Sequence, residues 1–185
     1  MGHSPCGAAV RNGNAERIHS LLGLRPTDIW REVPESQISG AALPAGWYLV
    51  LFNRKELKDA ILEGLSTLGE VVYCLVEDHV MFSCASGWKH GKSLWAVTHD
   101  CEKGLRHLEI KGDAPASLKV IQAKHESQQG AEEEADVDHI YDVPAELAKD
   151  LTGFRHDQGT PGMKDKPFQV LEKKSFFSRL LGAKN

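Results

Sequence analysis

Continuous apolar runs predict the strands of this chain. Residues 47–52, 70–76 and 94–99 are almost wholly apolar, aromatic or β-branched, which is typical of strands buried on both faces. Residues 79–85 and 105–111 follow short turns, and connections of this length join antiparallel strands. The pattern therefore predicts an α+β fold, with a single mainly antiparallel sheet of about five strands and helices packed on it.

Apolar residues at helical spacing predict four helices. One lies within residues 14–30, and the next covers residues 57–68, where we expect Asn53 to cap the helix. A third helix begins near Asp113, and a fourth spans residues 143–153 and ends at a glycine. These helices are candidates to cover the predicted sheet.

Proline, glycine and charge divide the chain into three parts. Residues 1–46 are rich in turn-forming residues and are interpreted as an N-terminal arm, residues 47–157 as the α+β core domain, and residues 158–185 as a linker with a basic amphipathic tail. With each hairpin centred on its turn, both faces of the sheet are largely apolar. The later helices, the arm or a partner must then cover the second face, which leaves open a homodimer formed through it.

Composition narrows the classes of protein. The 185 residues carry a formal net charge of −4, whereas a general nucleic-acid binder is more often basic, so we expect no nucleic-acid partner. There is no apolar run of the length of a membrane helix, no export signal and no CxxC pair, so we expect a cytoplasmic protein with reduced thiols. Membrane contact through the short basic tail is not expected.

Motifs of catalysis are missing from the sequence. It contains no P-loop, no G-x-S-x-G elbow and no strand-linked G-x-G-x-x-G, so we expect no enzyme, no catalytic residue, no cofactor and no metal. The predicted register does bring His99, His107 and Cys84 near one another, and acidic residues lie beside them. That cluster keeps open a metal-dependent hydrolase as the alternative, although histidines at strand ends more often have a structural role.

An acidic stretch is the main candidate for a binding surface. We interpret residues 126–138 as a solvated loop, whose carboxylates would attract a basic partner, with nearby aromatic side chains as anchors. The predicted partner-binding residues are Glu132, Glu133, Glu134, Asp136, Asp138, Tyr141, Asp142 and Trp88.

Two segments, residues 88–100 (WKHGKSLWAVTHD) and residues 143–157 (VPAELAKDLTGFRHD), resemble parts of small bacterial cytoplasmic proteins. The layout of a meandering sheet, helices and an acidic loop is similar to that of immunity proteins, which neutralise a toxin. This resemblance implies a non-catalytic protein that binds another protein, a basic toxin, and occludes it through an acidic surface. A metal-dependent hydrolase and a structural dimerising subunit are the alternatives.

Overall fold

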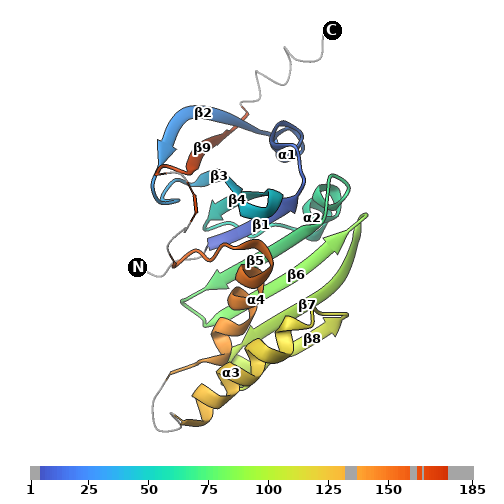
Figure 1. The fold of residues 1–185 in the computed structure, drawn as a ribbon, viewed down its shortest axis with the longest axis vertical. Helices are drawn as coiled ribbons and strands as arrows, with labels where there is room; N and C mark the ends of the chain where they lie inside the picture. The colour runs from blue at the N-terminus through green and yellow to red at the C-terminus, as the bar shows by residue number, and fades with distance from the viewer. Residues whose placement is uncertain (1–4, 132–136, 159–161, 164, 175–185) are drawn as a thin grey trace.

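The computed structural model describes residues 5–131, 137–158, 162–163 and 165–174, and within them nine strands form one antiparallel sheet (Figure 1). The strands lie in the order β2-β9-β3-β4-β1-β5-β6-β7-β8. Their bounds are β1 Pro5–Arg11, β2 Leu24–Arg31, β3 Ile38–Leu43, β4 Trp47–Asn53, β5 Val71–Glu77, β6 Phe82–Lys89, β7 Lys92–Asp100, β8 Glu109–Gly112 and β9 Phe168–Lys173.

The prediction of a sheet of about five strands is therefore wrong. Residues 5–43, predicted to be a surface arm, supply β1, β2 and β3, and β9 comes from the predicted linker and tail. β1 (PCGAAVR) and β3 (ISGAAL) are made mainly of small residues, which carry little strand propensity of their own. β2 contains Pro26, a residue confined to sheet edges, and β2 is an edge strand.

Four α-helices flank the described sheet: α1 Ala15–Leu22, α2 Asp59–Ser66, α3 Ser117–Ala131 and α4 Val143–Thr152. Short 3₁₀ helices occur at η1 Pro44–Gly46, η2 Cys101–Lys103 and η3 Ile140–Asp142. α3 continues to Ala131, so residues 126–131 of the predicted acidic loop are helical. Asn53 caps no helix, because it ends β4 and Lys58 precedes α2.

Local capping explains where two helices begin and end. The side chain of Asn14 accepts a hydrogen bond of 3.0 Å from the amide of Arg17 at the start of α1, and Gly23 ends that helix with a φ of 65°. α4 carries Pro144 in its first turn and ends at Gly153, whose φ is 78°. Both helices agree with their predicted positions.

Helices cover the two faces of the sheet separately. The core on one face packs α1 and α2 against β1, β4 and β5, and its buried members include Ile18, Leu62, Leu65, Val10, Val50 and Val71. The core on the other face packs α3 and α4 against the sheet, and its buried members include Leu118, Leu147, Ala148, Leu49, Val72 and Val97. Figure 1 shows α3 and α4 crossing β5 to β8, so the chain covers both faces with its own helices.

The registers of the central hairpins differ from the prediction, by one residue between β6 and β7 and by three residues between β7 and β8. Val97 lies opposite Ala85 and Ile110, whereas Cys84 pairs with Thr98 on the other face. Because side chains alternate between faces, the one-residue shift separates Cys84 from His99. The predicted cluster of His99, His107 and Cys84 is therefore incomplete: the rings of His99 and His107 lie 6.3 Å apart, and Cys84 is on the other face.

No helix in the part of the chain that the structure describes is long and apolar enough to cross a membrane.

Candidate functional site

Trp88 and Asp138, two of the predicted partner-binding residues, are buried. Trp88 is 7% exposed, and its indole N–H donates to the hydroxyl of Ser86 at 2.9 Å. The side chain of Asp138 is 4% exposed, and its Oδ2 lies 2.9 Å from Nε2 of His99. Neither side chain is presented to solvent as a docking surface requires.

Tyr141 and Asp142 form internal contacts. The hydroxyl of Tyr141 donates to Asp78 at 2.8 Å, and burial together with that bond raises the pKa of Tyr141. Asp142 accepts a bond of 2.7 Å from the guanidinium of Arg155. The other four predicted residues, Glu132, Glu133, Glu134 and Asp136, lie outside the described residues.

Arg155 links three acidic side chains beside α4. Its guanidinium, in a side chain only 10% exposed, bonds Asp142, Glu146 and Asp157 at 2.7 to 3.1 Å. Burial on its own raises the pKa of Glu146, but the bonds from Arg155 and Lys149 outweigh it, so the pKa lies below its ordinary value. This network ties α4 to the loop after it and holds the three carboxylates in contacts within the chain.

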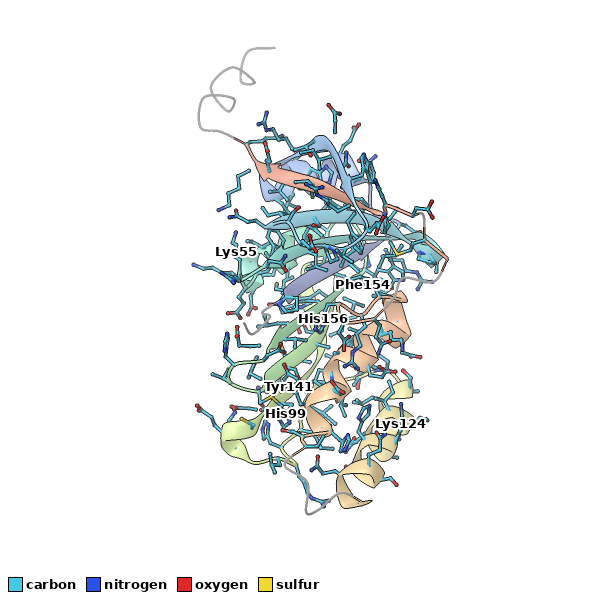
Figure 2. All side chains as sticks on the ribbon, turned by 90° about the vertical axis from the view of Figure 1, so that its left-hand side faces the viewer. Lys55, His99, Lys124, Tyr141, Phe154 and His156 are labelled. Atoms are coloured by element: carbon cyan, nitrogen blue, oxygen red, sulfur yellow. The ribbon has the colours of Figure 1, made fainter. Side chains whose placement is uncertain are left out.

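The ring of His99 is fully buried, so neither of its nitrogens can reach a substrate. Its Nδ1 donates to the carbonyl of His107 at 2.8 Å, and its Nε2 faces Asp138 at an ion-pair distance but not at a hydrogen-bond angle. A general base needs a free nitrogen within reach of the proton that it removes. His99 therefore joins β7 to the segment before α4, and Figure 2 shows it beside Tyr141.

The buried thiols do not provide a nucleophile. Burial raises the pKa of Cys6 to about 11 and that of Cys84 to about 12, and it also raises the pKa of Cys74. A reactive cysteine needs the opposite shift. Among the described residues, no group of three or more His, Cys, Asp or Glu side chains is arranged to hold a metal ion.

A large groove lies where β1 and β3 begin and where β4 and β9 end. Its volume is about 1040 Å³, and its lining combines apolar residues with charged ones. The lining residues are Pro5, Val33, Pro34, Glu35, Gln37, Ile38, Leu51, Phe52, Asn53, Arg54, Lys55, His156 and Lys173, and we call this site the basic groove. Its volume is that of a ligand site.

Asn53 builds one wall of the basic groove. Its side-chain amide donates to the carbonyls of Pro34 and Ser36 at 2.9 and 2.7 Å, and its backbone N–H donates to Gln37 at 3.0 Å. These three bonds fasten the 33–37 loop to the end of β4. The wall is therefore held in place before any ligand arrives, which lowers the entropy lost on binding.

Three cations line the basic groove. Arg54 follows Asn53 in the left-handed region with a φ of 63°, and the ammonium of Lys55 lies 5.4 Å from the centre of the Phe52 ring. Lys173 enters from β9. No carboxylate of a described residue lies within 4.0 Å of these three cations, and Glu35 is the single carboxylate in the lining.

A smaller pocket of about 240 Å³ extends the positive charge. It shares Phe52, Lys55 and Lys173 with the basic groove and adds Lys174. The two sites together offer cations above an apolar floor. This arrangement suits a ligand that carries negative charge and apolar surface at once.

Sequence reasoning missed the basic groove because its lining comes from segments far apart in the chain. The local signals are two dibasic pairs at strand ends, Arg54-Lys55 after β4 and Lys173-Lys174 at the end of β9. Neither pair indicates a site until β4 and β9 pair with the two sides of β3, which brings their last residues to the same end of the sheet. Figure 2 shows Lys55 well away from the pair of His99 and Tyr141, with His156 between them.

Comparison of the chain with protein-family models, with curated proteins and with solved structures gave no match.

Proposed function

We propose that this protein is a non-catalytic binding protein, and that it holds an acidic segment of a partner protein in the basic groove. The observation that carries the proposal is the groove itself, of about 1040 Å³, in which Arg54, Lys55 and Lys173 face one carboxylate. The whole chain has a net charge of −4, so the positive charge of this site is opposite in sign to the net charge of the protein. Local potential of this kind attracts an oppositely charged partner and orients it.

Apolar residues beside the groove favour a protein as the partner over a small anion. Val33 lines the groove and is 50% exposed, and Trp30 and Ile29 on the adjoining edge strand are 48% and 46% exposed. Exposed tryptophan is enriched among residues that dominate protein interfaces. A small anion would leave this apolar surface in water.

Toxin neutralisation is one form of the binding proposal. Neutralisation through an acidic docking surface could not use Asp138, which is buried, or Asp142, which is paired with Arg155. It would depend on the remaining predicted acids, which lie outside the described residues: Glu132, Glu133, Glu134 and Asp136. The contacts among described residues support a basic recognition surface more directly. A hydrolase built on His99 is not favoured, because its side chain is 0% exposed and its Nε2 faces the buried Asp138.

The binding proposal is tested with a labelled acidic peptide. A fluorescein-labelled hexaglutamate is titrated with the full chain at low salt, and anisotropy reports saturation. Lys55→Glu and Lys173→Glu are each expected to weaken binding about tenfold, and added salt should weaken it further. Lys124→Glu, on the exposed side of α3, introduces the same charge change elsewhere (Figure 2) and should leave the affinity unchanged.

Two results would contradict the binding proposal. One is the absence of saturable hexaglutamate binding in 20 mM salt, and the other is an equal effect of Lys124→Glu and Lys55→Glu. A thymidine oligonucleotide of the same charge is titrated in parallel. If it binds more tightly than the peptide and with the same sensitivity to Lys55→Glu, the ligand is a nucleic acid and the proposal of an acidic protein segment fails.

Arg54→Gly separates charge from folding at this site. A non-glycine residue at a φ of 63° is strained by about 1–2 kcal/mol, which offsets the entropy cost of a new glycine. Arg54→Gly is therefore expected to keep or raise the midpoint of thermal unfolding while it weakens hexaglutamate binding. A loss of binding that accompanies a loss of stability would not support a role in recognition.

A further inference from the structure

A small apolar cavity lies between the sheet and α4, next to the basic groove. Its volume is about 40 Å³. Pro5, Leu51 and His156 line both the cavity and the groove, so the two sites adjoin. Figure 2 labels His156 at this junction and Phe154 close to it.

Small residues create the cavity. Gly7 and Ala9 of β1 face Ala145 and Ala148 of α4, and Leu49 of β4 forms part of the wall. A β-carbon built on Gly7 would lie 3.3 Å from the end of the Leu49 side chain, so that wall is already close-packed. The space remains because α4 presents alanines to a strand of small residues.

Two polar side chains in the lining of this cavity, Arg155 and Cys74, are not available to bind a charged or polar ligand group. Arg155 lines it, but its guanidinium already bonds Asp142, Glu146 and Asp157. The thiol of Cys74 is also in the lining, and burial raises its pKa, so it stays uncharged. An apolar site of this kind favours an apolar group over ordered water.

We propose that the cavity is an anchor site for one branched aliphatic side chain of the size of valine, carried by the acidic segment that binds in the basic groove. This inference rests on the proposed function, and it specifies the ligand as acidic residues flanking one small aliphatic residue. The volume decides the size, since about 40 Å³ is roughly a quarter of the ~150 Å³ cavity that accepts benzene. A phenyl ring is too large and a methyl group leaves space unfilled.

The test compares three labelled peptides on the full chain, each with four glutamates around a central alanine, valine or phenylalanine. The valine peptide is expected to bind about tenfold more tightly than the alanine peptide, since two further methyl groups are removed from water. The phenylalanine peptide is expected to bind no more tightly than the alanine peptide. Equal affinity for valine and alanine, or the highest affinity for phenylalanine, overturns the inference.

A cavity-filling variant checks where the discrimination arises. Ala148→Leu places a larger side chain in the cavity and should abolish the preference for valine, while the alanine peptide still binds through the cations. If circular dichroism shows that Ala148→Leu does not fold, Gly7→Ala is measured instead, because its new methyl group meets only the flexible end of Leu49. Persistent valine preference in a folded variant overturns the inference.

Failure of the two proposals is distinguishable. If none of the three peptides binds, the proposed function fails. If all three bind with the same affinity and Lys55→Glu weakens each of them, the groove is confirmed as an acidic-peptide site and only the anchor inference fails.

Discussion

The buried pair of His99 and Asp138 gives the sharpest prediction about stability. The two side chains are 0% and 4% exposed, and they connect β7 to the residues that lead into α4. Asp138 also accepts a hydrogen bond of 3.1 Å from the backbone of Tyr141 through its other oxygen. Asp138→Leu removes both oxygens, so Nε2 of His99 and the backbone N–H of Tyr141 lose the group that faces them.

The expected cost follows from the burial of both partners. Removing one member of a buried pair leaves the other without compensation, which costs about 3–5 kcal/mol. For a chain of this size, 1 kcal/mol moves the midpoint of thermal unfolding by about 2–4 °C, so the midpoint should fall by roughly 6–20 °C. Asp100→Asn is the control at a surface pair, because Asp100 is partly exposed and pairs with Lys103 at 3.4 Å. That change should cost at most about 1 kcal/mol.

Urea unfolding followed by far-ultraviolet circular dichroism measures both variants, with the slope against urea checked for constancy. The double variant His99→Leu/Asp138→Leu completes the cycle. Since two apolar residues need no partner, the double variant should be more stable than either single leucine variant. The reasoning is refuted if Asp138→Leu costs less than about 1 kcal/mol with an unchanged slope, or if the two leucine substitutions are additive.

Three further predictions concern groups outside the groove. Burial lowers the pKa of His125 below its ordinary value of 6.5, so the unfolded chain takes up the proton at a higher pH than the folded chain. The free energy of unfolding should therefore decline as the pH falls below 6.5. Urea unfolding at pH 7.5 and about pH 5 should show a smaller decline in His125→Leu. A β-carbon at Gly40 would collide with the hydroxyl of Tyr48, so Gly40→Ala should lower the free energy of unfolding by about 1–3 kcal/mol. A β-carbon at Gly130 on α3 meets open space, so Gly130→Ala should raise it by about 0.5–1 kcal/mol in the same assay. Trp30 is 48% exposed and the other three tryptophans are buried, so iodide should quench only the part of the tryptophan fluorescence that comes from Trp30. This quenchable part should be lost in Trp30→Phe, and its persistence in that variant would contradict the exposure of Trp30.

Local chemistry explains which elements were predictable from the sequence. α1 and α4 carry their own start and stop signals in Asn14, Gly23 and Gly153, and these signals act within a few residues. The apolar sequences of β4, β5 and β7 predict strands that are buried on both faces. Such elements need no knowledge of the rest of the fold.

The missed strands depend on contacts that are distant in sequence. β1 is central because β4 and β5 pair with its two edges, and its small side chains fit between helices on both faces. Its composition alone indicates a loop. The basic groove was missed for the same reason, because the 33–37 loop, Lys55 and Lys173 meet only after β9 has paired with β3.

The place of β9 has a consequence for biosynthesis. β9 lies between β2 and β3, and no other described strand pairs with β2. Until residues 168–173 have been synthesised, one edge of β3 is therefore unpaired in the nascent chain, and β2 has no described strand to pair with. Exposed edges of this kind invite pairing with other chains, so the interval before the last strand emerges is when this polypeptide most needs protection by a chaperone.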